Sequence, residues 1–462
     1  MSNRARGWTA DLFEPVDGAS TAVFRIALGT MIAWDVVRYW WFGWIDEYYV
    51  RPKYHFGYLW LTWVQPPPGD GIYVLFAVMG VAAILVALGL FYRPAIVVLW
   101  LLYTWKFLIE KSVYMNHYYL IGLLCFLFIF IPAHHTWSLD RRRHREWSET
   151  VPRWAVLLLR AQLFIVYFGG ALAKINPDWL RGEPMLSSLA ARVPGVPEIA
   201  FHFPPALLAY PIAYGGILTD GLLPILFCFR RTRLFAYAWA LMFHALNEVF
   251  LSIGVFSYLM SLAVTIFFDP DWPRRLAARR GWSWATPTPA TAAPGPVPAS
   301  RGLQRLLLAG LAAYAVVQIA LPLRHFLYPG YVSWTEEGHR FSWHMKLRGK
   351  QSRMGIVGTL PTTHTSFAID PREDLTDRQL RKLFTFPDML LQYVHFKRDE
   401  LRQTGADPEI RVEWYCSLNG APERLLVDPT VDLAKVEPSI WPAPWILRTP
   451  AESAAAQAKL SQ

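Results

Sequence analysis

Cysteine and charged residues are both scarce in this sequence. Its three cysteines, Cys125, Cys228 and Cys416, are spread over 462 residues, and their spacing matches no set of metal ligands, so we expect no metal site. Charged residues make up 17% of the chain and hydrophobic residues 54%. Because the apolar residues gather in several long runs, this composition excludes an ordinary soluble protein and predicts a multi-span membrane protein.

Signals for secretion, repetition and nucleic-acid binding are also missing. The N-terminal stretch MSNRARGWTADLFEP is polar, and the first apolar run, near Thr21, has no small-residue cleavage site, so we expect no cleavable signal peptide. No internal repeat is visible. The net charge of +10 indicates no nucleic-acid partner, because the arginines form short clusters between apolar runs, where membrane topology explains them. We expect membrane lipid to surround the apolar segments and to be a partner of the protein.

About nine segments are long or apolar enough to span a membrane as helices. Two of them, 235–250 and 252–268, are the least distinct, because they also fit one long run broken at Gly254. The predicted fold class is mainly α, a polytopic membrane helix bundle. The predicted spans are 20–38, 72–92, 94–112, 117–133, 153–174, 205–229, 235–250, 252–268 and 303–325.

The arginine clusters support this number of spans. If the N-terminus with Arg4 and Arg6 is cytoplasmic, nine spans place every arginine-rich turn on the cytoplasmic side, as the positive-inside rule requires. An odd number of spans then places everything after about residue 326 outside. The arginine-rich turns contain Arg93 and the stretches 141–145, 230–233 and 274–280.

Changes in composition predict the domains. Residues 1–325 form the bundle, within which 283–300 is rich in proline, alanine and threonine and is expected to be a flexible cytoplasmic loop. Residues 326–450 are more polar and strand-like, which predicts a small α+β domain outside the membrane. The last residues, 451–462, are expected to be a disordered tail.

Two patterns describe the external domain. Residues 412–418 alternate between apolar and polar, Asn419 and Gly420 form a hairpin turn signal, and 424–427 could return as the partner strand. The stretch TDRQLRKLFTFPDMLLQYVHFKRDEL predicts one or two amphipathic helices, with Pro387 as the break. We expect this domain to pack on the outer mouth of the bundle.

Most polar side chains in or beside the spans lie toward the outer side. Ionisable groups at membrane depth are costly, so they normally face a cavity or a partner. We therefore expect a polar pocket that opens outward. Its candidate residues are Asn116, His117, Lys174, His244, Asn247 and Glu248.

Lys174 is the most informative of these residues. It follows Arg160 and Tyr167 at intervals of seven residues, so the three side chains share one helical face. A lysine that loses hydration beside a cavity can be present as the neutral amine and act as a base. The alternative is a lysine whose side chain extends to the interface from a helix end. By itself, the turn NPDW at 176–179 would be only a helix stop with an interfacial tryptophan.

The two histidines also have simpler explanations. His117, at a helix start, could be an interfacial histidine whose hydrogen bonds are satisfied. His244 could be buried and bonded to a neighbouring helix. Both explanations stay open from spacing alone.

Two pairs of opposite charges lie within single spans. Lys106 and Glu110, four residues apart in the third span, are most simply an ion pair within one helix. Asp35 and Arg38 in the first span are interpreted in the same way. Neither pair is expected to do chemistry.

Several blocks of the sequence resemble one known family. The stretch LLLRAQLFIVYFGGALAKINPDWLRGEPM at 157–185 resembles a helix and turn of the vitamin K-dependent gamma-glutamyl carboxylases. The likeness runs in family order from about residue 20 to 440 and indicates a bacterial-type homologue with a horizontally transferred transmembrane domain. The other matching blocks are ALGLFYR (87–93), NHYYLIGLLCF (116–126), HHTWSLD (134–140), FHALNEVFLSIGVFSY (243–258), LRHFLYPGYVSWTEEGHRFSWHM (323–345) and IRVEWYCSLNGAPERLLVDPTVDL (410–433).

This resemblance implies a reaction and roles for residues. The family is a group of lyases that convert glutamate to gamma-carboxyglutamate with a reduced vitamin K quinol, O2 and CO2. A base deprotonates the quinol, which reacts with O2 to give a strongly basic species; that species removes the glutamate gamma-proton, CO2 adds to the carbanion, and the quinone leaves as its epoxide. The resemblance implies Lys174 as the base, His117 as a second catalytic residue and Asn116 as the residue that holds the quinol oxygen. The expected cofactor-binding wall of the pocket consists of Tyr167, His244 and Asn247.

The sequence also departs from the animal members of the family. They continue for several hundred residues beyond the block that ends near Leu433, and that extension helps to hold a propeptide, whereas this chain stops at Gln462. We therefore expect a glutamate-containing peptide or protein as substrate without propeptide-directed processive carboxylation. The expected quinol is reduced vitamin K or menaquinol, and the expected location is a bacterial cytoplasmic membrane.

Two other functions stay open. One is a quinol epoxidase or oxygenase that does not carboxylate protein. The other is a membrane transporter or binding protein without enzymatic activity, although a transporter should show repeated halves or discontinuous helices in matching positions, and neither is visible. A binding protein would tolerate Lys174→Ala, whereas either enzyme would lose epoxide formation.

Overall fold

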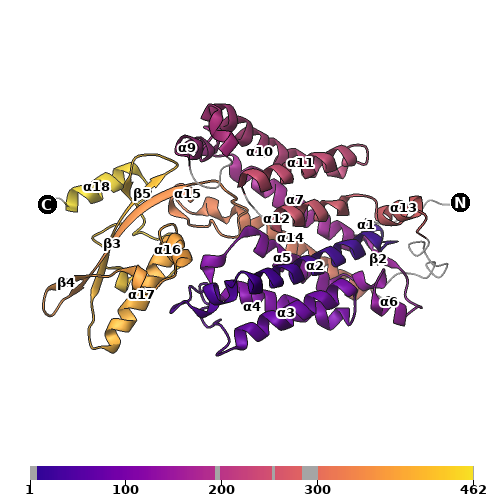
Figure 1. Ribbon diagram of the computed structural model, residues 1–462, viewed down its shortest axis with the longest axis horizontal. Helices are drawn as coiled ribbons and strands as arrows, with labels where there is room; N and C mark the ends of the chain where they lie inside the picture. The colour runs from indigo at the N-terminus through magenta and orange to yellow at the C-terminus, as the bar shows by residue number, and fades with distance from the viewer. Residues whose placement is uncertain (1–7, 193–197, 252–254, 283–299, 461–462) are drawn as a thin grey trace.

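Apolar helices make up most of the computed structural model, which describes residues 8–192, 198–251, 255–282 and 300–460. The helix bundle occupies one end of an elongated molecule, and a sheet with the helices that pack against it occupies the other (Figure 1). The expected flexible loop at 283–300 falls, apart from its last residue, outside the described residues.

Nine apolar helices of the described chain match the predicted spans one for one. Six are long and apolar enough to cross a membrane: α2 (Ala19–Trp41), α3 (Gly71–Leu88), α4 (Tyr92–Ile109), α7 (Arg153–Lys174), α10 (Pro205–Cys228) and α14 (Arg301–Leu323). The other three are α5 (Asn116–Phe130), α11 (Arg233–Leu251) and α12 (Val255–Ala263), which continues as the 3-10 turn η5 (Val264–Phe267). The prediction of a mainly α membrane helix bundle is confirmed.

The end of the bundle farther from the sheet is tied together by buried polar contacts. Gly89, with φ 61°, ends α3 in the left-handed conformation that glycine adopts without strain. The Asp140 carboxylate then accepts the backbone N–H groups of Phe91 and Tyr92 at 3.0 and 2.9 Å, which satisfies free donors at the start of α4. The short elements α1 (Trp8–Leu12), β1 (Pro15–Asp17), α6 (Leu139–Arg143), β2 (Thr150–Pro152) and α13 (Trp272–Arg279) also lie at this end (Figure 1).

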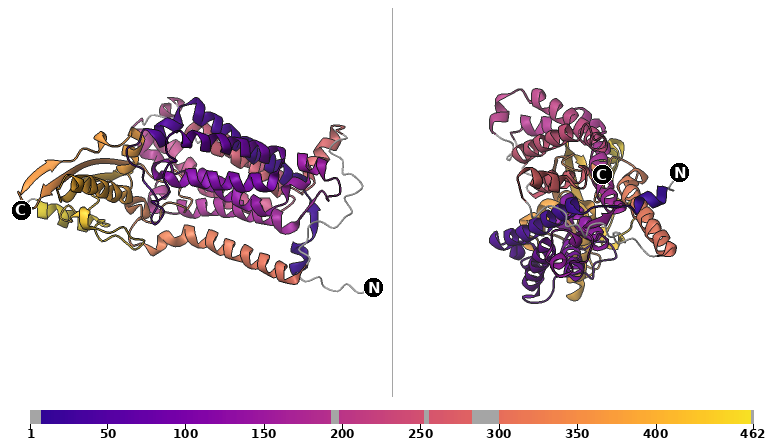
Figure 2. Two further views of the ribbon diagram at one scale, coloured as in Figure 1. Left: turned by 90° about the horizontal axis from the view of Figure 1, so that it is seen from below. Right: turned by 90° about the vertical axis from the view of Figure 1, so that its right-hand side faces the viewer.

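Helix α14 lies on the outside of the bundle (Figure 2) and is mostly exposed. One polar contact joins it to α7, because the Tyr314 hydroxyl donates to Gln162 Oε1 at 2.7 Å. Its apolar outer residues suit contact with lipid, since lipid chains satisfy them as well as protein would. The helix carries the chain to the opposite end of the bundle, where the C-terminal domain begins.

The C-terminal domain is a four-stranded antiparallel sheet in the order β4-β3-β5-β6. Residues of β3 pair with β5 over ten positions, including Met354 with Trp414. Helices pack their apolar sides against one face of this sheet. The elements are β3 (Lys350–Leu360), β4 (Thr365–Ala368), α16 (Asp377–Leu383), α17 (Pro387–Gln403), β5 (Glu409–Leu418) and β6 (Arg424–Leu425).

Two local predictions for this domain are confirmed, and the prediction for the tail is wrong. Pro387 is the first residue of α17, as expected for proline at a helix start. Asn419 and Gly420 follow β5 with φ 52° and 75°, so both adopt the left-handed conformation of a hairpin turn. The predicted disordered tail is wrong for Pro450–Leu460, which forms α18; its Ser453 hydroxyl donates to Leu425 O at 2.8 Å.

Buried polar contacts dock the domain on the bundle. Gln379 Nε2 donates to Glu110 Oε2 at 2.9 Å, and Lys111 Nζ lies 2.7 Å from Asp388 Oδ2. The predicted Lys106–Glu110 ion pair is therefore wrong. Glu110 turns away from its own helix because the backbone and side-chain donors of the docking surface satisfy it.

Candidate functional site

A cavity of about 450 Å³ lies between α7, α10, α11 and α12, near the C-terminal domain. Most of its wall is apolar, with side chains that include Val166, Leu208, Ile212, Phe243 and Met260. Four of the six predicted site residues line it: Tyr167, Lys174, His244 and Asn247. A cavity is therefore present where α7 ends, but its wall is largely apolar and not polar as predicted, and Glu248 does not line it.

Lys174 is paired in this cavity with a carboxylate that sequence reasoning missed. Its Nζ lies 2.5 Å from Asp220 Oδ2 and also donates to Gly170 O at 3.3 Å. The side chains of Lys174 and Asp220 are only 8% and 5% exposed. The Trp179 ring lies 5.6 Å from the Lys174 nitrogen. The lysine that was expected to face the cavity alone therefore has a buried carboxylate group as its partner.

The turn after α7 holds the lysine in place. The Asn176 side chain accepts from Trp179 N and donates to Ala173 O, both at 2.9 Å, so it links the end of α7 to the short helix α8 (Pro177–Leu180). Tyr331, from the C-terminal domain, donates to Asn176 Oδ1 at 2.8 Å. The NPDW turn therefore ends α7 and also connects the bundle to the C-terminal domain through a hydrogen bond.

Two glycines make room for the ion pair. A Cβ on Gly170 of α7 would lie 3.1 Å from Asp220 Oδ2 and 3.2 Å from Met345 Cε. A Cβ on Gly216 of α10 would lie 3.5 Å from Lys174 Cε. Small residues at a helix interface let two membrane helices approach closely. Here that approach brings the carboxylate of α10 to the amine of α7.

Tyr167 and His244 form the other polar contact of the cavity. The Tyr167 hydroxyl and His244 Nε2 lie 2.7 Å apart, and both side chains are buried. Tyr167 stands two helical turns before Lys174 on α7, while His244 belongs to α11. The interpretation of His244 as a buried histidine bonded to a neighbouring helix and its interpretation as part of the pocket wall are both correct.

Asn116 and His117 lie beside the cavity but do not line it. Asn116 accepts from the Tyr114 hydroxyl at 3.0 Å and donates to His344 O at 2.9 Å, so both ends of its amide bind protein. The His117 ring lies 6.1 Å from the ring of Phe256, which is in the cavity wall. These two residues support the cavity from one layer further out.

Residues 341–346 of the C-terminal domain, which we call the closing segment, border the cavity. Met345 and Lys346 line it, and the Trp343 ring packs so closely on Gly169 that a Cβ there would lie 2.7 Å from Trp343 Cδ1. Phe341, Trp343 and Lys346 all have φ between 55° and 62°, which is unfavourable for residues with a Cβ. Such conformations persist only where surrounding contacts determine them, and they gather at functional sites.

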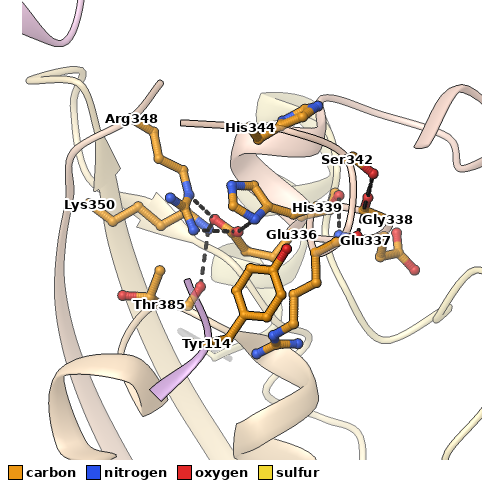
Figure 3. A network of polar contacts seen from close by, with 12 residues as sticks. Tyr114, Glu336, Glu337, Gly338, His339, Ser342, His344, Arg348, Lys350 and Thr385 are labelled. Atoms are coloured by element: carbon orange, nitrogen blue, oxygen red, sulfur yellow. Dashed lines mark hydrogen bonds and ion pairs between the residues drawn. The ribbon is translucent and has the colours of Figure 1, made fainter. Parts of the chain in front are cut away.

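A polar network anchors this segment (Figure 3). Glu336 is held by Arg348 and by Lys350 Nζ at 2.8 Å, and Lys350 also donates to Trp334 O at 2.6 Å. Burial lowers the pKa of His344 to about 3, so its ring is neutral at neutral pH. The network fixes the segment that carries Met345 and Lys346 into the cavity.

Other sequence predictions in the bundle differ from the structure. Arg160 shares the α7 face with Tyr167, but it donates to Ile266 O and Phe268 O at 2.9 Å and does not line the cavity. Lys106 lies 3.9 Å from Asp35 of α2, while the predicted Asp35–Arg38 pair is present at 3.5 Å. The contacts of Arg160 and Lys106 are made to other helices or turns, and spacing along one helix does not reveal such contacts.

No metal centre is present in the described part of the chain. Within it, no three His, Cys, Asp or Glu side chains lie together as metal ligands would. All three cysteines are free.

Two family models match the chain. The HTTM domain model matches residues 13–272, and the model of the vitamin K-dependent gamma-carboxylase lumenal domain matches residues 303–452. The chain belongs to the vitamin K-dependent gamma-carboxylase family. No solved structure matches it.

Both matched regions of the chain build the cavity. Lys174, Asp220 and His244 come from the HTTM domain, whereas Met345 and Lys346 come from the lumenal domain. Asp220 had a signal in the sequence, because a lone carboxylate inside an apolar run is a candidate functional residue in its own right. Phe341, Trp343 and Met345 fall within the matching block at 323–345, but no signal in the sequence assigned them to the cavity.

Proposed function

We propose that this protein is a quinol-dependent gamma-glutamyl carboxylase, a lyase that couples conversion of a quinol to its epoxide with glutamate deprotonation and CO2 addition. The observation that carries this proposal is the buried Lys174–Asp220 pair, at 2.5 Å, in an otherwise largely apolar cavity of about 450 Å³. A buried pair of titratable groups in a cavity is typical of a proton-transfer site.

The cavity fits a reduced quinone. Its apolar wall suits a naphthoquinol ring, and a quinol with a lipid-soluble tail would reach the bundle from the membrane. Lys174 keeps its proposed place as the principal catalytic residue, with His117 as a supporting one. Asn116, Tyr167, His244 and Asn247 are proposed to position the quinol, which is a substrate because it leaves as the epoxide.

A second cavity suits the glutamate substrate. It has a volume of about 640 Å³ and lies between the bundle and the C-terminal domain. Its charged wall is mixed: the cations are Lys111, Arg324 and Arg340, and the acidic residues are Glu336, Glu337, Asp388 and Glu437. Asp388 binds both Lys111 and Arg340. The three cations are the groups of this wall that could bind the carboxylate of a glutamate peptide.

The proposed topology places these cavities toward the outside. The arginine-rich elements α6 and α13 lie at the end of the bundle opposite the sheet domain (Figure 1). This arrangement supports a cytoplasmic N-terminus and an external C-terminal domain in a bacterial cytoplasmic membrane. The glutamate substrate would then arrive from outside, and the menaquinol or vitamin K quinol from the lipid.

The test is an assay that scores the two half-reactions separately. Purified protein in detergent is given reduced vitamin K, a glutamate peptide and labelled bicarbonate, and epoxide and fixed label are both measured. We expect both products, in amounts that depend on each other. Label without epoxide would contradict the coupled mechanism, and epoxide without label would favour a quinol epoxidase. If neither product forms with reduced vitamin K or with menaquinol, the result would favour a binding protein or transporter.

A further inference from the structure

The Lys174–Asp220 pair supplies the buried charged groups of the cavity that is proposed to bind the quinol. Among the described residues of the wall, the charged side chains are Lys174, Asp220 and Lys346. Lys346 is exposed, whereas both members of the pair are buried. Tyr167 and His244 are the other titratable groups of the wall, and they are bonded to each other at 2.7 Å.

The geometry does not suit a lone neutral amine as the base. An amine that is neutral while Asp220 is ionised would leave the carboxylate, 2.5 Å away, as an unpaired charge in an apolar cavity, and an amine that has passed its proton to Asp220 makes Asp220 the group that holds the proton. Such a charge is strongly disfavoured when it has no partner. An ammonium group beside a carboxylate avoids that cost, but an ammonium already carries all its protons and has no lone pair to accept another.

We infer that Asp220 is the proton acceptor and that Lys174 and Asp220 act together as one base. The inference rests on the proposed function and changes the assignment of roles within it. The quinol O–H bond breaks, an O–H bond forms on the Asp220 carboxylate, and the electron pair stays on the quinol oxygen. Lys174 remains an ammonium and faces the resulting quinolate.

Charge and hydrogen bonding both fit this division of roles. Before transfer the charges of the ammonium and the carboxylate cancel, and after transfer those of the ammonium and the quinolate cancel, so the buried pair and the quinol together keep a net charge of zero. An ammonium has three N–H donors, and Asp220 Oδ2 and Gly170 O accept two of them. The third donor is left to bind the quinol oxygen.

The first experiment compares variants of the full-length protein. Asp220→Asn keeps the shape and removes the proton acceptor, and Asp220→Glu restores a carboxylate. Asp35→Asn is the matched control, because Asp35 is also a buried carboxylate of the bundle with a lysine 3.9 Å away, but it lies outside the cavity. We expect Asp220→Asn to lower epoxide formation by about a hundredfold or more, with partial recovery in Asp220→Glu and none of this loss in Asp35→Asn.

A second experiment uses the unaltered protein, so it does not depend on whether a variant folds. Reduced vitamin K is bound without oxygen, and infrared difference spectra are recorded together with the visible absorbance of the quinolate. We expect the quinolate absorbance and a protonated carboxyl C=O band to appear together, and the band to be absent in Asp220→Asn. Quinolate without the band, or neither signal from protein that makes epoxide in air, would overturn the inference.

The outcomes separate the two proposals. If the unaltered protein makes epoxide and Asp220→Asn makes it at the same or a higher rate, a lone Lys174 amine is the base and only this inference fails. If the unaltered protein makes no epoxide with either quinol, the proposed function fails and this inference fails with it.

Discussion

Lys174 and Lys106 are both buried lysines in apolar helices of the same bundle, yet their surroundings differ. Lys174 lines a cavity of about 450 Å³ and lies 2.5 Å from its carboxylate partner. Lys106 borders a void of about 10 Å³, and its carboxylate partner, Asp35, lies 3.9 Å away. The rings of Tyr39, Tyr103 and Tyr118 surround the Lys106 nitrogen at 4.3 to 4.9 Å.

The difference shows that burial of an ionisable group does not by itself make a site. The Lys106 nitrogen has no hydrogen-bond acceptor in the described structure and is stabilised by aromatic faces and by Asp35. The space beside it holds one water at most. Lys174 has room for a second molecule and a carboxylate in contact. We therefore assign chemistry to Lys174 and a structural role to Lys106.

The largest expected effect on activity comes from substituting Lys174, and a substitution of Lys106 is the comparison. Lys174→Ala should lower epoxide formation by about a hundredfold or more, because the cavity loses its cation and leaves Asp220 without its partner. Lys106→Met should leave the rate within a few-fold and lower the free energy of unfolding by about 1–3 kcal/mol, because Asp35 keeps only Arg38. Epoxide assays and thermal unfolding measure the two effects. Equal losses of activity would refute the comparison.

The comparison can be extended to cations outside the membrane. Arg340 lines the second cavity and binds Asp388 at 2.8 Å, whereas Arg353 binds Glu423 at 2.9 Å on the exposed sheet. Arg340→Gln should raise the KM for a glutamate peptide by roughly tenfold and leave epoxide formation without peptide unchanged. Arg353→Gln should change neither value. A KM unaffected by Arg340→Gln would remove this cavity from the peptide site.

A smaller effect is expected from filling the space beside the ion pair. Gly170→Ala would place a Cβ 3.1 Å from Asp220 Oδ2 and 3.2 Å from Met345 Cε, so the pair or the closing segment must shift. We expect a several-fold loss of epoxide formation, consistent with the cost of overpacking. Gly221→Ala is the control, since its Cβ would only reach Ala171 Cβ at 3.8 Å. Equal rates in both variants would mean that the pair tolerates displacement.

The smallest expected effect concerns the neutral histidine above the cavity. Burial lowers the pKa of His344 from 6.5 to about 3, so the unfolded chain binds its proton more readily than the folded one. Its contribution to stability is complete above pH 6.5 and is lost as the pH falls toward 3. His344→Gln should therefore reduce the fall in unfolding temperature between these values. An unchanged pH dependence would show that His344 is not buried as a neutral ring.

Local patterns in the sequence predicted much of the fold. Apolar length predicted all nine bundle helices, and a seven-residue interval placed Tyr167 and Lys174 on one face of α7. Pro387 and the Asn419–Gly420 turn were informative because each restricts its own backbone. The tail prediction failed, because α18 is held by contacts with β6 that its composition does not reveal.

The site was predicted only in part, because its remaining partners come from other helices. Asp220 lies 46 residues from Lys174 and meets it through the packing of α10 on α7. Asn116 and His117 were placed at the correct end of the bundle, but their side chains bind or pack against other residues behind the cavity wall.

By itself, the sequence indicated a membrane protein, the approximate extent of the nine bundle helices and a lysine at the end of α7. The tertiary structure decided which of two buried lysines has a cavity and which carboxylate it binds. The reason is physical. Helix formation depends on neighbours along the chain, whereas the pairing of buried charges depends on which helices pack together and how closely.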